Sequence, residues 1–439
     1  MRSIFSVCLI FITFTIAACA GLKAPMTPQE EADMLFAKAS QLHDAELYDE
    51  AGVQFAEYVK RFPESNSADN AKLQIANGYF QQGKYDQAVA AYKEVVDNYP
   101  QSDASDRALL SVGDAYFAQQ KYNEAIESYR KVLDKYPRLG TQIAISAQDR
   151  INALKDIEED MKILSEGKEE DKDNAQYDIA DIYFTVYGDY ERARAEFQKV
   201  VDRWPKSELA DDALWKIADC CWNIASRELP SRIFSREQQA YIKLTGIYDH
   251  YPQLTKMRLF HLDVHWPVVE EKVSEYDHAY MQTRRIINEF PLIAKMTPVD
   301  VLPENYRRAF TTWRDITNTY SNSDRAPAVP ARVARAFVDL GNLYYNMGQK
   351  HFASLLFRES LLTMPTPEGH LGMARYYGNI TSVAAPPWAY RRAFYHIKKA
   401  AELTPPDTPM ADKVSWAKEW MNYKMRIEGL EVWPDRRTQ

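Results

Sequence analysis

One segment of this chain occurs twice, and that repetition constrains the fold more than any other feature. "YFQQGKYDQAVAAYKEVVDNYPQS" begins at Tyr79, and the related "YFAQQKYNEAIESYRKVLDKYPRL" begins at Tyr116, 37 residues later. A fixed period of this length predicts a repeat architecture in which each unit stacks on the next. The same spacing joins prolines, alanines, tyrosines and further ring positions: Pro63, Pro100 and Pro137; Ala51, Ala88 and Ala125; Tyr48, Tyr85 and Tyr122; Phe55, Tyr92 and Tyr129.

Each unit has the pattern of two helices joined by a short turn. Apolar residues recur at helical spacing over 73–80 and again over 88–96, with "QQGK" between them. Gly83 lies in that turn, where a helix C-terminus favours a positive φ. The Tyr99–Pro100 pair ends the second helix, because proline has no backbone N–H and restricts the residue before it. The sequence therefore predicts an all-α fold, a superhelical solenoid of helical hairpins.

Helix starts are also marked in the sequence. In "TPQEEADMLF", Thr27 is expected to be an N-cap, with Pro28 at the first helical position and Glu30 completing a capping box. The connectors "PESNSADNA", "PQSDASDRA" and "PKSELADDA" each place a serine where an N-cap would satisfy the free amides of the next helix. The predicted N-cap serines are Ser65, Ser102 and Ser207.

Further along the chain one copy of the 37-residue pattern, here called the frame, is missing, and the later copies are less regular. A long helix is predicted over 141–165, followed by the charged run "SEGKEEDKDN". We interpret 138–172 as a joint between a three-repeat arm over 28–137 and a C-terminal arm of degenerate repeats over 173–405, with a capping helix and tail over 406–439. Alternatively, the charged run is a solvated helix end. The later copies of the frame are Tyr190, Ala193, Phe197 and Pro205; Ala240, Ile247 and Pro252; Ala279, Ile286 and Pro291; Gly341, Tyr344, Ala353, Phe357 and Pro365; Ala393 and Pro405.

The order of small residue, Tyr, Tyr, Ala, ring and Pro resembles the tetratricopeptide repeat. The 37-residue period with its "YPxSxxAxxA" connector more narrowly resembles tetratricopeptide-repeat envelope lipoproteins of Gram-negative bacteria, such as the outer-membrane assembly lipoprotein BamD and the Tol-Pal-associated protein CpoB. The resemblance covers roughly residues 28–137 and 173–252, is weak over 253–330 and returns at 331–405. It implies a non-enzymatic scaffold that binds protein partners.

Residues 1–18 have the features of a secretory signal, with one cation and then the apolar run "IFSVCLIFITFTIAA", which is too short for a stable membrane span. The run ends in "IAACA", which resembles a lipobox and makes Cys19 the expected site of lipidation, at the start of a short tether over 19–27. The alternative is an ordinary signal cleaved after Ala18 or Ala20. In the sorting rule that accompanies the resemblance, Ala20 implies a lipid anchor on the periplasmic side of the outer membrane.

Composition excludes several classes of function. The formal net charge of −8 argues against nucleic acid as a partner, and it gives no electrostatic reason to lie on anionic lipid, so membrane attachment would rest on the acyl chains. Of the four cysteines, Cys8 leaves with the signal and Cys19 is modified. Cys220 and Cys221 are neighbours in a helical stretch and are expected to be small packing residues rather than a disulfide.

No catalytic motif is present, so no enzyme activity, cofactor or metal is expected. The sequence contains no G-x-S-x-G, H-E-x-x-H or Walker loop. The best metal candidate is "FHLDVHW", in which His261 and His265 share one helix face with Asp263 between them. No third ligand is evident nearby, and two partly exposed helix histidines are the preferred interpretation.

A second apolar stripe on the first helix of each repeat is the candidate binding site. The resemblance implies that these positions line a concave groove, and large rings there would favour an apolar or aromatic segment of a protein partner. Leu73 and Leu110 stand where chaperone-binding repeats carry basic or amide residues, which argues against a charged C-terminal tail as the ligand. The alternative is packing between neighbouring repeats. The candidate groove residues are Phe36, Leu73, Asn77, Phe80, Leu110, Asp114, Phe117, Tyr177, Phe184, Trp215, Trp222 and Tyr345.

Two functions are consistent with these features. The first is an outer-membrane-anchored periplasmic scaffold for envelope assembly, with a β-barrel assembly protein or an apolar client segment as partner. The chain is longer than BamD and lacks the coiled-coil N-terminus of CpoB, so neither specific role carries over. The second is an accessory lipoprotein of a polysaccharide-export or secretion pore.

Overall fold

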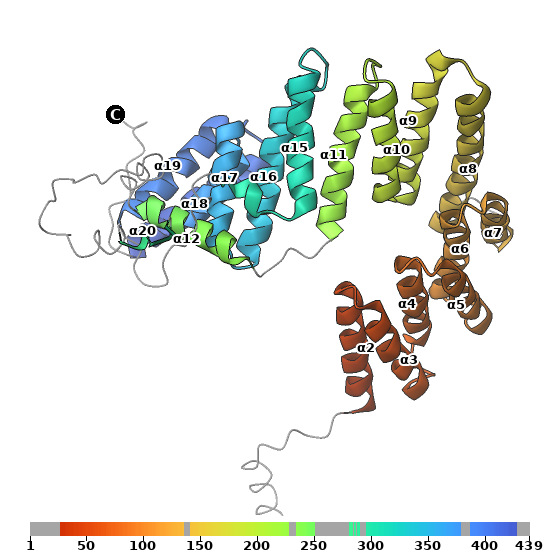
Figure 1. Cartoon of the computed structure of the whole chain (residues 1–439). Coiled ribbons are helices and arrows are strands. Elements are labelled where there is room, and N and C mark those ends of the chain that lie inside the picture. Colours follow the sequence, from red (N-terminus) through yellow and green to blue (C-terminus); the bar gives the residue numbers. More distant parts are fainter. Residues whose placement is uncertain are drawn as a thin grey trace, which may run out of the picture. The chain divides into compact units, whose positions relative to one another are not determined.

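The regular elements of the described chain are all helices, which confirms the predicted all-α class (Figure 1). Among the described residues no helix is both long and apolar enough to cross a bilayer. Cys19, His261 and His265 lie outside the described part of the chain. The computed structural model describes residues 27–135, 141–227, 234–250, most of 281–289, 296–378 and 387–427.

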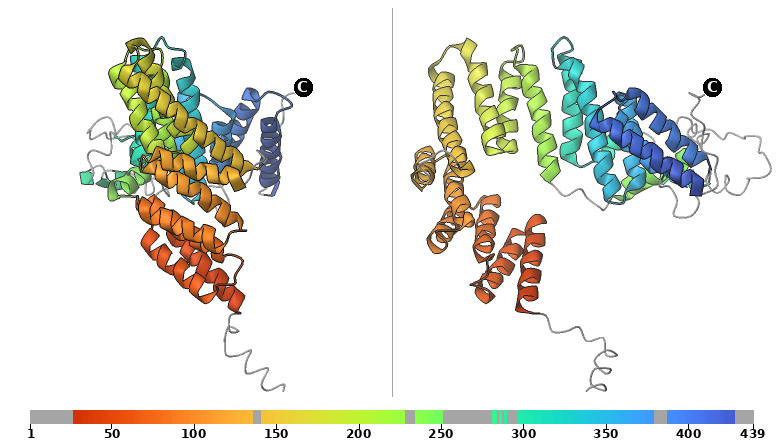
Figure 2. Two further views of the ribbon diagram at one scale, coloured as in Figure 1. Left: turned by 90° about the vertical axis from the view of Figure 1, so that its right-hand side faces the viewer. Right: turned by 180° about the vertical axis from the view of Figure 1, so that it is seen from behind.

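The chain divides into two compact units. The first extends to Glu166 and also includes Thr185–Gly188, whereas the second contains Gly167–Phe184 and everything from Asp189 onward. The division at Gly167 falls inside the segment 138–172 that was predicted to be a joint. Within each unit the two further views show rows of antiparallel helices (Figure 2).

The first unit contains three helical hairpins followed by a long helix, and each helix packs on the next one along the chain. The long helix occupies the range predicted for it. The helices are α2 (Pro28–Asp44), α3 (Tyr48–Arg61), α4 (Ala68–Gln81), α5 (Tyr85–Asn98), α6 (Asp103–Ala118), α7 (Tyr122–Lys135) and α8 (Gln142–Glu166).

Close approach within each hairpin comes from small residues that face rings. Ala76 and Ala88 are fully buried, and so is the Tyr129 ring. Gly113 lies directly under that ring, because a Cβ there would come within 2.3 Å of a Tyr129 ring carbon. The hairpins therefore interlock through rings of the second helix and small residues of the first.

The predicted helix ends are partly confirmed. Thr27 and Glu30 form the capping box, and Gly83 has a φ of 72°. The Ser102 hydroxyl accepts a hydrogen bond from the Ser105 amide, as an N-cap should. The prediction was wrong at Ser65 and Ser207. Their helices begin later, at Ala68 and Ala210. The two hydroxyls accept from the Ser67 and Leu209 amides just before those helices and also bond the Tyr58 hydroxyl and the Asp173 carboxylate.

The second unit continues the hairpin arrangement. Its helix pairs are α9 with α10, α11 with α15, α16 with α17, and α18 with α19, and α20 packs on α19. The helices are α9 (Lys172–Ile182), α10 (Tyr190–Arg203), α11 (Ala210–Arg227), α12 (Arg236–His250), α15 (Glu304–Thr319), α16 (Val329–Asn346), α17 (Lys350–Thr363), α18 (Pro367–Gly378), α19 (Pro387–Leu403) and α20 (Pro409–Ile427). Short turns of helix are η1 (Glu169–Asp171), η2 (Tyr183–Tyr187), η5 (Pro298–Val301) and η6 (Ala326–Ala328).

The pairing of α11 corrects the sequence interpretation. The frame placed the next second helix around Ala240 and Ile247, but α11 packs on α15, and α12 lies against α17. The physical reason is the ring cluster of α15, since the Trp222 ring on α11 lies 4.9 Å from Tyr306 and 5.8 Å from Trp313. Of the other predicted copy in this region, Ile286 is buried, and Ala279 and Pro291 lie outside the described residues.

The last helix packs through only one of its faces. Val414, Met421 and Met425 are buried, whereas Trp416 is 65% exposed and Tyr423 is 64% exposed. The capping helix predicted in 406–439 thus covers its neighbours with methionines and leaves aromatic rings on its outer face.

A histidine pair lies between α18 and α19. The Nδ1 atoms of His370 and His396 are 2.9 Å apart, and the Tyr377 ring stacks on His396 with ring centroids 5.8 Å apart. Burial lowers the pKa of His396 to about 4, with His370, Arg358 and Arg392 adding to the effect. Burial also lowers the pKa of His370, where Lys399 adds to the effect and Glu402 opposes it. The pair therefore favours neutral imidazoles.

We expect the second unit to lose stability as the pH falls from 6.5 towards 4. In that window an unfolded imidazole binds a proton that folded His396 does not, so the free energy of unfolding decreases as the pH is lowered. In His396→Gln this loss should be smaller by about 1–3 kcal/mol. Thermal melts between pH 7 and pH 4 measure it. Parallel pH profiles for the wild type and the variant would contradict the assignment.

Candidate protein-binding surface

Eleven of the twelve predicted groove residues lie on the first helices of successive hairpins, Phe184 lies in η2, and none of the twelve is exposed. Leu73 and Phe117 are 3% exposed and Tyr345 is 7% exposed. The other nine are half-buried. Most of these side chains are therefore covered by other parts of the protein.

Some of the predicted residues belong to hairpin cores. The Phe36 ring meets the Phe55 and Tyr58 rings edge-on, at centroid distances of 5.4 Å and 5.3 Å. Tyr177 meets Phe197 in the same way at 5.1 Å. Buried Leu73 belongs to the core of the second hairpin. Phe36, Leu73 and Tyr177 therefore pack within their own hairpins rather than lining an open groove.

The ring positions one turn later are covered by the following elements. Tyr187 stacks on Phe117, with ring centroids 3.6 Å apart and planes 8° apart. In the second unit, the Lys216 ammonium lies 4.7 Å from the centre of the Phe184 ring. The guanidinium of Arg332 lies 5.2 Å from the Trp222 ring, and that of Arg375 lies 3.9 Å from the Tyr345 ring. Such cation–π contacts stabilise the ring and close its face to solvent.

Acidic residues beside these rings form ion pairs with the same neighbours. Arg150 Nε lies 2.7 Å from Asp114 Oδ1 in the first unit. In the second unit, Lys216 Nζ lies 2.6 Å from Asp181 and an Arg332 Nη atom lies 3.1 Å from Asp219. In each case the carboxylate belongs to one first helix and the cation to the helix that begins the next layer. The pairs therefore tie neighbouring layers together across the candidate groove.

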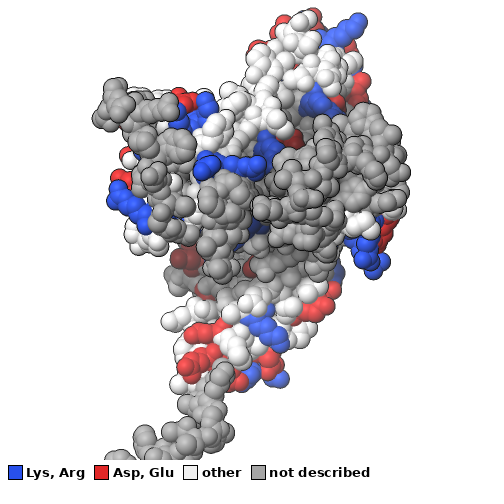
Figure 3. All heavy atoms as spheres, turned by 90° about the vertical axis from the view of Figure 1, so that its left-hand side faces the viewer, with Lys and Arg blue, Asp and Glu red and all other residues white. Residues whose placement is uncertain are grey.

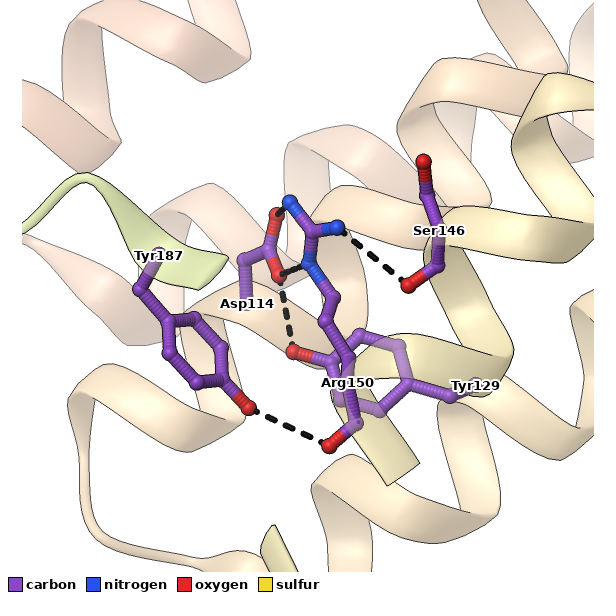
Figure 4. A network of polar contacts seen from close by, with 5 residues as sticks. All are labelled: Asp114, Tyr129, Ser146, Arg150 and Tyr187. Atoms are coloured by element: carbon purple, nitrogen blue, oxygen red, sulfur yellow. Dashed lines mark hydrogen bonds and ion pairs between the residues drawn. The ribbon is translucent and has the colours of Figure 1, made fainter. Parts of the chain in front are cut away.

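The pair in the first unit is the centre of a larger network (Figure 4). Asp114 Oδ1 accepts hydrogen bonds from the Tyr129 hydroxyl and from Arg150 Nε, both at 2.7 Å. The Tyr187 hydroxyl donates to the Arg150 carbonyl oxygen at 3.4 Å. Burial, reinforced by the Asp114 charge, raises the pKa of Tyr129 far above its ordinary value and keeps the phenol a hydrogen-bond donor. The network joins α6, α7, α8 and the segment Thr185–Gly188.

Sequence reasoning found Asp114 but missed its partners. Tyr129 was assigned only a packing role, although Asp114 and Tyr129 each lie 37 residues after Asn77 and Tyr92, which make the same hydrogen bond at 2.8 Å. That repetition was a usable signal. Arg150 and Tyr187 had no such signal, because α8 and η2 fall outside the regular frame.

The second unit also has an open cavity of about 700 Å³ between α10, α11, η5 and α15. Three arginines line it, of which Arg194 pairs with Glu191 and Arg308 pairs with Glu304. Cys221 also lines the cavity, and burial raises its pKa, which favours the thiol. The cavity was not predicted, because the packing of α15 on α11 was not predicted.

Nothing in the described residues assembles a metal site. No group of three or more His, Cys, Asp or Glu side chains there is arranged to hold an ion. Cys220 and Cys221 are both free and buried, as expected of packing residues. On the face shown in Figure 3, acidic and basic side chains are interspersed rather than gathered into one basic field.

Comparison with known proteins identifies repeats in both units. Residues 73–139 and 174–207 match family models of the tetratricopeptide repeat. No curated protein matches the chain. Similar solved structures include a tetratricopeptide repeat protein from Parabacteroides merdae, with 11% identity, 88% of this chain and 98% of that chain covered, and a TM-score of 0.22.

Two further similar structures are from yeast. Tom70 has 12% identity, covers 91% of this chain and 90% of its own, and has a TM-score of 0.23. The TPR2AB domain of Sti1, in a complex with pHSP90, has 16% identity, covers 64% of this chain and 99% of its own, and has a TM-score of 0.26. These superpositions are loose, and the fold assignment rests on the family models and on the helices themselves.

We expect Asp114→Ala to destabilise the first unit by about 2–3 kcal/mol. The change leaves a half-buried guanidinium without its carboxylate and a buried phenol without its acceptor. Asp134→Ala, which removes an exposed carboxylate from α7, is the matched control and should stay within about 0.5 kcal/mol of the wild type. Denaturant unfolding measures both. Equal losses in the two variants would show that the network does not stabilise the fold.

Proposed function

Since residues 73–139 and 174–207 are tetratricopeptide repeats, we propose that this protein is a non-enzymatic scaffold that binds protein partners during assembly of the bacterial cell envelope. The observation that carries the proposal is the first-helix face of successive layers within each unit, where a ring lies beside a polar group in the same layer. Ion pairs and hydrogen bonds hold those layers in register, so the protein presents a preorganised surface at low entropic cost to a partner.

The charge distribution supports a protein partner over a nucleic acid. The chain has a formal net charge of −8, and the cations beside the candidate rings, Arg150, Lys216 and Arg332, are already paired with aspartates. Binding the phosphate backbone of a nucleic acid would need cationic side chains that are not already paired. A partner segment that brings apolar and aromatic side chains fits the half-buried rings.

Photocrosslinking tests the proposed surface. Gln74 is half-buried beside Asn77 on α4, whereas Glu57 is exposed on α3. A benzophenone amino acid at position 74 should crosslink envelope proteins that position 57 does not reach. Identical products from both positions, or none from position 74, would contradict a groove-based scaffold.

We also propose that the protein is held at the outer membrane by a lipid on Cys19. The support is the sequence "IAACA" after the apolar run of residues 1–18, with Ala20 following the cysteine. The tether over 19–27 spans at most about 30 Å when fully extended, which would keep the repeats close to the membrane.

Cys19→Ala should release the protein from the membrane or leave it unprocessed, because an acyl chain is the proposed anchor. Fractionation of cells that express the wild type and the variant measures this. Cys220→Ala is the control and should fractionate like the wild type, since that thiol is buried in α11. A correctly cleaved Cys19→Ala protein that stays in the membrane fraction would contradict the proposed lipid anchor.

A further inference from the structure

The contact between Phe117 and Tyr187 shows what a ring position on these first helices can accept. The Tyr187 ring lies flat on Phe117 at a centroid distance of 3.6 Å, with the Arg150 guanidinium 5.9 Å from its centre. Tyr187 belongs to Thr185–Gly188, a segment that reaches this face from outside the hairpin. The protein thus supplies its own aromatic ligand to the third repeat.

The same position in the second repeat has no such cover. The Phe80 ring is half-buried against the core of its hairpin, and among the described rings it meets Tyr85, its neighbour across the turn, at 5.4 Å. Phe117 has the equivalent neighbour in Tyr122, at 5.9 Å, in addition to Tyr187. Among the described residues, no second ring and no cation lies over Phe80.

The open position has an identifiable cause. In the second repeat the Tyr92 hydroxyl bonds Asn77 and also meets Ser111 on α6. Ser111 lies nine residues after the connector serine Ser102, as Lys216 lies nine residues after Ser207. A short neutral hydroxyl therefore stands where the later layers place Arg150, Lys216 or Arg332, and no long cation reaches back over Phe80.

We propose that Phe80 is the docking position for a phenylalanine or tyrosine side chain of the protein partner, which stacks on it as Tyr187 stacks on Phe117. This inference rests on the scaffold function proposed above and names the chemistry of what that scaffold binds. The flanking groups are uncharged: the Asn77 amide accepts from Tyr92 and donates to Gln74 at 3.2 Å. The partner segment is therefore aromatic at this point and needs no charge beside the ring.

Two variants of the full chain distinguish the contribution of the Phe80 ring to binding from that of the groups around it. Phe80→Ala removes the stacking surface. The double variant Asn77→Asp with Ser111→Arg keeps Phe80 but builds the ion pair of the third repeat in front of it, so the ring should be covered as Trp222 is by Arg332. Melting temperatures of both variants show that the fold is retained, and the double variant remains informative if Phe80→Ala fails to fold.

The probe is a library of displayed random peptides selected on the wild-type chain. We expect the selected peptides to share a phenylalanine or tyrosine, and their affinity to fall about five- to tenfold in both variants, or when that ring is changed to alanine. Selected peptides that bind the double variant as tightly as the wild type would overturn the Phe80 site and leave the scaffold intact. A library that yields no peptide on the wild type would overturn the site and the scaffold together.

Discussion

The hairpins α6–α7 and α16–α17 depend on one contact, the packing of a ring from the second helix against a glycine of the first. Tyr129 lies on Gly113, and Phe357 lies on both Gly341 and Gly372. A Cβ at Gly341 would come within 2.6 Å of a Phe357 ring carbon. Overpacking of this kind shifts backbones or forces strained rotamers, so the small residue and the ring must be chosen together. Because the small residue and the ring recur together in each repeat, their pairing appears in the sequence as the 37-residue period.

The same contact determines what the other face of each first helix is free to do. Because the small residues face the partner helix, the acid that follows each small residue and the ring one turn further along point towards the next layer. Asp114, Asp181 and Asp219 meet cations there, and the rings beside them are stacked or covered. Layer-to-layer contacts and the candidate binding surface are therefore made by the same side chains, and a partner can use only the positions that the protein leaves uncovered.

The sequence predicted the regular part of the fold well, because in that part local spacing and tertiary contact coincide. The hairpins from α2 to α7 and the α16–α17 pair follow directly from the frame.

The pairing of α11 was mispredicted for a physical reason. Spacing reports which face of a helix can pack, but not which later helix meets it. Ala309, Trp313 and Ile316 on α15 with its C-cap Tyr320 have the spacing of Ala88, Tyr92 and Val95 on α5 with its C-cap Tyr99. This signal competed with the nearer copy around Ala240. For the candidate site, residue type located the rings but not the side chains that cover them. Lys216 lies nine residues after Ser207, as Ser111 does after Ser102, so this cover had a sequence signal, whereas Tyr187 lies in η2, outside the regular frame.

The pairing of α11 with α15 has a consequence for the order in which the chain folds. Hairpins of the first unit close over turns of a few residues, whereas α11 must wait for a helix that begins beyond residues 228–303. Closing a loop of that length instead of a short turn costs on the order of 3 kcal/mol more chain entropy, and non-local contacts of this kind slow folding. During synthesis the N-terminal repeats are complete while the apolar face around Trp222 has no partner. The long intervening segment therefore leaves α11 open to misassociation until α15 has been made.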